Sequence, residues 1–80
     1  MMITGDVLRE FLEVELGVDL DGIEDTTPLF SSGIVDSFAL VTLMMHLESE
    51  GGFRINPVDV TLDNLDTIER ILAYCARIAA

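Results

Sequence analysis

The sequence predicts an all-α fold in which three substantial helices and one short helix pack around a single core. Three stretches of the chain carry apolar residues three and four positions apart, which is the spacing of one helical face. No stretch alternates apolar and polar residues as a half-buried strand does. The 80 residues, half of them hydrophobic, suffice for one small core, so we expect a single domain over residues 1–80.

The first helix is expected over residues 6–16. Its apolar residues recur at the spacing of one helical face: Leu8, Phe11, Leu12 and Leu16. The side chain of Thr4 or of Asp6 can cap the start of this helix. Gly17 stands where a residue in the left-handed conformation commonly ends a helix.

A long loop over residues 17–35 is expected to follow. It contains five large apolar residues between glycines and a proline: Leu20, Ile23, Leu29, Phe30 and Ile34. Loops of this length are uncommon in compact domains unless they are functional, and the apolar residues indicate that the loop lies across the core. Pro28 allows a helical turn. The acidic run over residues 19–25 lacks the Gly and Glu positions of a calcium loop, so we interpret it as solvated, with weak divalent-cation binding as the alternative.

The second helix is expected from Ser37 to about Glu50, with Asp36 as its capping residue and glycines at positions 51 and 52 ending it. Pro57 can open a short third helix over residues 58–65. The closing helix is expected from the spacing of its apolar residues, which are Ile68, Ile71, Leu72, Cys75 and Ile78. Asp66 with Glu69 three residues later forms a variant of the capping box.

Charge excludes several classes of function. The chain has 15 acidic and 4 basic residues, a formal net charge of −11, so it cannot neutralise phosphates as nucleic-acid-binding proteins do. A partner with a basic face is its natural complement. Cys75 alone excludes an internal disulfide and a multi-thiolate zinc site. The N-terminus does not read as a signal peptide and no apolar stretch is long enough for a membrane span, so we expect a cytoplasmic location.

Nucleophilic catalysis is not expected. The only imidazole, His46, lies nine residues after Ser37 on the same helix, which corresponds to roughly 13 Å of rise and nearly opposite faces. The two side chains therefore cannot form a dyad. We interpret His46 as a solvent-facing residue and predict neither a catalytic residue nor a metal site.

The second helix has more apolar residues than one core face can hold. Leu40, Leu43, Met44 and Leu47 gather on one side, which must be the core face. Phe38 and Met45 fall outside this face, and Val41 lies at its border beside Ser37. These three residues form either an exposed contact surface or additional core covered by the third helix or the long loop.

The run over residues 25–38, Asp-Thr-Thr-Pro-Leu-Phe-Ser-Ser-Gly-Ile-Val-Asp-Ser-Phe, resembles the attachment motif of acyl carrier proteins. The resemblance extends over nearly the whole chain and implies an up-down four-helix bundle without catalytic activity of its own. It implies that Ser37 receives 4'-phosphopantetheine from coenzyme A through a separate magnesium-dependent phosphopantetheinyl transferase. The thiol of that arm then holds an acyl or aminoacyl group as a thioester.

The resemblance also assigns roles around Ser37. Asp36 caps the helix and adds negative charge beside the attachment point. The apolar contact patch consists of Phe38, Val41 and Met45. Glu48 adds a second negative charge further along the helix. Ala39 and Thr42 occupy places where carriers of fatty-acid synthesis usually have acidic residues. We therefore expect a stand-alone, monomeric carrier of a specialised pathway, loaded by an acyl- or aminoacyl-activating ligase and served by acyltransferases or synthases. The alternative is a small acidic helical interaction domain with no prosthetic group.

Overall fold

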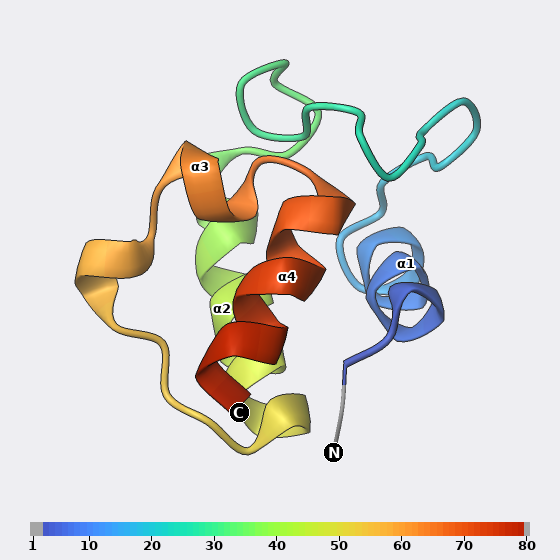
Figure 1. The fold of residues 1–80 in the computed structure, drawn as a ribbon. Coiled ribbons are helices and arrows are strands. Elements are labelled where there is room, and N and C mark those ends of the chain that lie inside the picture. Colours follow the sequence, from blue (N-terminus) through green and yellow to red (C-terminus); the bar gives the residue numbers. More distant parts are fainter. Residues whose placement is uncertain (1–2, 80) are drawn as a thin grey trace.

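The computed structural model describes residues 3–79, in which all regular structure is helical (Figure 1). The elements in chain order are α1 (Gly5–Val14), α2 (Ser37–Gly51), the 3-10 turn η1 (Pro57–Asp59), α3 (Leu62–Leu65) and α4 (Ile68–Ala79). Helix α4 contacts each of the other three helices. The predicted all-α class with four helices is confirmed.

Helices α2 and α4 run in the same direction in Figure 1. The chain after α2 turns back through η1 and the short α3, and so returns to the end of the molecule where α2 begins. The start of α2, the start of α4, α3 and part of the long loop therefore lie at one end of the bundle. Both α2 and α4 present the positive end of the helix dipole there.

The capping residues explain where the first two helices begin. The Thr4 hydroxyl accepts a hydrogen bond from the Val7 N–H at 3.2 Å, so Thr4 is the cap of α1. An Asp36 carboxylate oxygen accepts one from the Ala39 N–H at 2.8 Å and caps α2 as predicted. Helix α1 ends at Val14, two residues earlier than expected, and the chain then passes through Gly17 in the left-handed conformation (φ 67°).

The predicted third helix over residues 58–65 is divided in two. Asn56 caps the η1 turn through the Val58 N–H, at 3.1 Å. Val60 then leaves the helical conformation (φ −79°, ψ 80°), which separates η1 from the four residues of α3.

The predicted capping box at the start of α4 is wrong. The Thr67 hydroxyl accepts a hydrogen bond from the Arg70 N–H at 3.0 Å and so caps the first turn. Asp66 faces the long loop instead and is almost wholly buried. Its carboxylate accepts hydrogen bonds from the Phe30 N–H at 2.9 Å, the Ser31 N–H at 2.9 Å and the Ser31 hydroxyl at 2.7 Å.

These bonds change the acidity of Asp66 and anchor the loop. Burial alone would raise the pKa of the Asp66 carboxyl, but hydrogen bonds from Ser31 and Phe30 outweigh burial and hold the pKa below its ordinary value. The Asp66 carbonyl also accepts from the Leu29 N–H at 2.6 Å, and the Asp25 carbonyl accepts from the Glu69 N–H at 3.0 Å. The loop is thus fastened to the start of α4.

The long loop lies across the core, as its apolar residues predicted. Leu29 is fully buried, and Leu20, Ile23 and Phe30 are partly buried against the core. The expectation fails for Ile34, which is 40 % exposed, because Val35 takes the inward position next to it. Around Pro28 the chain forms turns rather than a helical turn.

Four residues of α4 are among the buried residues of the described chain. Ile68, Ile71 and Cys75 are buried as expected, and burial raises the pKa of the Cys75 thiol to about 11. Tyr74 is buried too, which the spacing of apolar residues did not predict. Its hydroxyl donates to the Asp59 carboxylate at 2.9 Å, and burial together with this bond raises the pKa of Tyr74. Within residues 3–79, no helix is both long and apolar enough to cross a membrane.

Candidate attachment site and docking surface

Ser37 is the first residue of α2 and is exposed at the end of the bundle where α2 and α4 begin. A tight turn leads into it, closed by a hydrogen bond from the Gly33 N–H to the Phe30 carbonyl at 3.1 Å. Gly33 has φ 84°, a conformation that an L residue with a side chain rarely adopts. Val35 is buried just before the helix begins. The turn and this buried residue together fix the backbone at the start of α2, where Ser37 is exposed.

The surroundings of Ser37 favour an added phosphate group but give no route to self-catalysis. Backbone N–H groups of the first helical turn and the helix dipole stabilise negative charge at this position. Asp36 is the neighbouring carboxylate, and its cap bond to Ala39 occupies one oxygen. His46 lies further along α2, where its ring stacks on Phe11 of α1. Ser37 thus has an exposed position at a helix N-terminus and no imidazole of its own chain beside it.

His46 is not the solvent-facing residue that the sequence suggested. Its ring centroid lies 3.8 Å from that of Phe11, with 13° between the ring planes, and the residue is partly buried. This side of α2 faces α1, and the position of α1 relative to α2 depends on long-range packing rather than on local sequence.

Three predicted contact residues form an exposed apolar stripe on α2, which we call the α2 stripe: Phe38, Val41 and Met45. Their side chains are 84 %, 60 % and 66 % exposed, respectively. Neither α3 nor the long loop covers them, so the reading in which they belong to the core is wrong. Contiguous exposed apolar side chains commonly mark contact sites.

Glu48 lies one turn beyond the stripe and is partly buried. One of its carboxylate oxygens accepts a hydrogen bond from the Ile55 N–H at 2.8 Å. Glu48 therefore helps hold the segment after α2 against the helix, a structural role that the sequence analysis did not foresee.

Comparison with known proteins decides the family. The family model of the phosphopantetheine attachment site matches residues 6–75. The chain belongs to this family of carrier domains. It is 30 % identical over 76 residues to the D-alanyl carrier protein of Abiotrophia defectiva, covering 94 % of this chain and 80 % of the relative. It is 31 % identical over 74 residues to the probable acyl carrier protein PigG of Serratia sp. (strain ATCC 39006), covering 92 % and 80 %, respectively.

Family membership fixes the general function. The protein is a non-catalytic carrier, whose family binds 4'-phosphopantetheine covalently on a serine. A carrier domain of this kind interacts with a phosphopantetheinyl transferase and with biosynthetic enzymes. The bound arm supplies a thiol that holds the cargo as a thioester, so the buried Cys75 of the carrier need not take part. An exposed serine at a helix N-terminus fits the attachment of such an arm.

The carrier exposes three further apolar residues that the sequence analysis missed, one of which is Val14 of α1 at 66 %. Val58 of η1 is 76 % exposed and Leu62 of α3 is 50 % exposed. A small cavity of about 140 Å³ lies between α2 and α3, where Leu40 and Leu62 are among the lining residues. The sequence offers little indication of the exposure of Val58 and Leu62, because apolar residues in this segment do not recur at a regular spacing that would show which side faces outward.

Proposed function

We propose that Ser37 is the serine to which 4'-phosphopantetheine is attached. Its exposed hydroxyl at the first residue of α2 is the observation that carries the proposal. The other serines of the chain fit less well. The hydroxyl of Ser31 donates to Asp66 at 2.7 Å, and that of Ser32 donates to the Pro28 carbonyl at 2.6 Å. Ser49 lies near the C-terminal end of α2, where the helix dipole disfavours a phosphate.

The proposed reaction needs a base from the transferase. The carrier offers no imidazole beside Ser37, since His46 stacks on Phe11. The Ser37 oxygen would bond to the phosphorus that bears the pantetheine arm, the pyrophosphate bond of coenzyme A would break, and adenosine 3',5'-bisphosphate would leave. A base of the transferase would accept the proton of the Ser37 hydroxyl. The carrier contributes the exposed hydroxyl, its fixed position and the dipole of α2, which stabilises the phosphodiester product.

The α2 stripe is proposed as the docking surface for successive partners. Phe38 stands directly beside Ser37, and the stripe continues along the helix through Val41 and Met45. Asp36 at one end and Glu48 at the other are proposed as its charged flanks, while the helix between them carries no carboxylate. Weak apolar contacts suit a carrier that several enzymes must bind and release in turn.

We further propose that the carrier acts as a monomer in the cytoplasm, as a single domain, within a specialised biosynthetic pathway. An acyl- or aminoacyl-activating ligase would load the thiol, and acyltransferases or synthases would use the thioester. Relatives named as a D-alanyl carrier and as an acyl carrier support this range of cargo. Isolating the carrier from cells and identifying the thioester-bound group by mass spectrometry tests the cargo.

The attachment site is tested by incubating the protein with coenzyme A, magnesium and a broad-specificity phosphopantetheinyl transferase, and then measuring its intact mass. We expect the mass of one phosphopantetheine group to be added to the parent protein and to Ser49→Ala, and no addition to Ser37→Ala. The Ser49 variant is the matched control because it removes an exposed hydroxyl from the same helix. Modification of Ser37→Ala would refute the assignment.

A further inference from the structure

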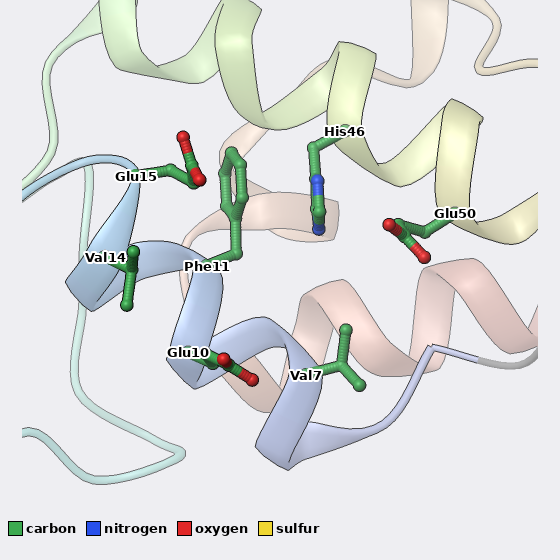
Figure 2. Close-up of a pocket in the computed structure, with 7 residues that line it drawn as sticks. All are labelled: Val7, Glu10, Phe11, Val14, Glu15, His46 and Glu50. Carbon is green, nitrogen blue, oxygen red and sulfur yellow. The ribbon is translucent and has the colours of Figure 1, made fainter.

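The side-chain packing that holds α2 in place begins well beyond Ser37. Leu43 and Leu47 are the buried residues of this helix. His46 packs on α1, where its ring stacks on that of Phe11 beside the pocket drawn in Figure 2. The first of these positions, Leu43, lies six residues after Ser37, which is more than one helical turn. Ser37 is therefore outside the tightly packed part of α2.

The first turn of α2 has less complete packing. Leu40 is only partly buried and lines the cavity of about 140 Å³, together with Phe30 of the long loop and Leu62 of α3. Side chains beside a cavity make fewer packing contacts than side chains in a close-packed interior. Helix ends also fray more readily than helix middles. The position of Ser37 therefore depends on a restraint other than side-chain packing.

Backbone hydrogen bonds in the long loop supply such a restraint. The Val35 N–H donates to the Leu29 carbonyl at 2.9 Å, which closes residues 29–35 into a ring that we call the closed segment. The Leu29 N–H in turn donates to the Asp66 carbonyl at 2.6 Å. Because the closed segment ends two residues before Ser37, the chain that enters α2 is tied to the start of α4.

The Asp66 side chain holds the closed segment at a second point. It is 7 % exposed, and its carboxylate accepts from the N–H groups of Phe30 and Ser31 and from the Ser31 hydroxyl. A carboxylate offers two acceptor oxygens, whereas an amide of the same shape offers one. The three bonds together fix both the path of the closed segment and its orientation toward α2.

We propose that Asp66 is a positioning residue for the transfer of phosphopantetheine, an inference that rests on Ser37 being the attachment serine. Asp66 acts through the closed segment, which restrains the first turn of α2. Reacting atoms must lie about 3–3.5 Å apart, and a misplacement of about 1 Å can slow a reaction about 100-fold. Release of the closed segment lets Ser37 move within the bound complex, so it lowers the rate of transfer. Binding through the α2 stripe is unaffected.

Single-turnover kinetics test the proposal, with the carrier mixed with saturating coenzyme A and an excess of a broad-specificity transferase. We expect Asp66→Asn to lower the rate constant at saturating transferase about tenfold. The transferase concentration that gives half of this rate should change less than about twofold, because the α2 stripe is intact. An unchanged rate constant, or a loss that appears only in the half-saturating concentration, would overturn the proposal.

Tyr74→Phe is the matched control for stability. It removes the hydrogen bond that the buried Tyr74 of α4 donates to Asp59 and leaves the contacts of the closed segment in place. Circular dichroism first identifies a temperature at which every variant is folded, and the rates are measured there. The rate constant should change less than about 1.5-fold for Tyr74→Phe. Equal losses in Tyr74→Phe and Asp66→Asn would show that lowered stability alone slows transfer, and would overturn the proposal.

Ser31→Ala is a milder second variant. It removes the hydroxyl bond at 2.7 Å and keeps the Asp66 charge and both backbone bonds. We expect a loss of about threefold in the rate constant, and this variant decides the outcome alone if Asp66→Asn does not fold.

NMR relaxation of the ¹⁵N-labelled chain gives a readout that is independent of the transferase. Backbone order parameters over residues 30–39 should be lower in Asp66→Asn than in the parent protein, with unchanged values at Leu43 and Leu47. Unchanged order parameters over residues 30–39 would overturn the proposal. Modification of Ser37→Ala would refute the attachment site itself, whereas a normal rate in Asp66→Asn with the group still on Ser37 would refute this inference alone.

Discussion

Replacing Asp66 by Asn tests whether the long loop is held by a single buried carboxylate. Asn keeps one carbonyl oxygen as an acceptor for the N–H groups of Phe30 and Ser31, but it loses the charge and turns the second oxygen into a donor facing the Ser31 hydroxyl. Hydrogen bonds to a charged group contribute about 1.5–3 kcal/mol and neutral ones about 0.5–1.5 kcal/mol. With partial relaxation, the loss over these bonds is about 2 kcal/mol.

That loss is large for a domain of this size. Stabilities of about 0.05–0.15 kcal/mol per residue correspond to roughly 4–12 kcal/mol for 80 residues. A loss of about 2 kcal/mol lowers the Tm of such a domain by about 8–16 °C. Circular dichroism during thermal and urea unfolding measures both quantities. Asp21→Asn, at an exposed position of the same loop, is the control and should change stability by less than about 0.5 kcal/mol.

The pH dependence gives a second readout of the same contact. The pKa of Asp66 is lower in the folded protein than in the unfolded chain, where it is about 3.9. The carboxylate therefore stabilises the fold fully above the unfolded value, and this contribution is lost as the pH falls through the folded value. The stability difference between the parent protein and Asp66→Asn should thus shrink below about pH 4. Equal stability of the Asp66 and Asp21 variants, or a difference that does not vary with pH, would refute the reasoning.

Three other predictions concern the surface and the thiol. Phe38→Ala should lower the kcat/KM of phosphopantetheine transfer about tenfold. It should change the free energy of unfolding by less than about 0.5 kcal/mol, because Phe38 is 84 % exposed. A large fall in Tm with normal transfer would contradict this prediction. The affinity of a partner that binds the α2 stripe should change less than about threefold between 50 and 300 mM salt, since the middle of the helix is uncharged. A collapse of this affinity in isothermal titration calorimetry would show that the docking face is wrongly assigned. Cys75 is buried and its thiol has a pKa of about 11. Its reaction with iodoacetamide at pH 8 should therefore be more than about 100-fold slower in the folded apo protein than in urea. Rapid labelling of the folded apo protein would contradict the burial of this thiol.

The sequence predicted those parts of the fold that local pattern determines. The periodicity of α1, α2 and α4 and the cap at Asp36 follow from residues within one or two turns of each other. The exposure of the α2 stripe could not be predicted from periodicity, because this pattern allowed Phe38 to be either exposed or covered by another segment. The structure resolved that choice.

Other features depend on contacts between distant segments and were not predictable from spacing. Asp66 bonds to Ser31, 35 residues away along the chain, so its position in a capping pattern pointed to the wrong partner. His46 faces α1 only because of how the helices pack. Tyr74 is buried because its hydroxyl finds the Asp59 carboxylate, a partner that periodicity does not reveal.

The most direct test of the account is to locate the arm on the modified carrier. After transfer from coenzyme A, the protein is digested and its peptides are fragmented in a mass spectrometer. The account predicts the phosphopantetheine group on the peptide that contains residue 37, with fragment ions assigning it to Ser37. Assignment of the group to Ser31, Ser32 or Ser49 would contradict it.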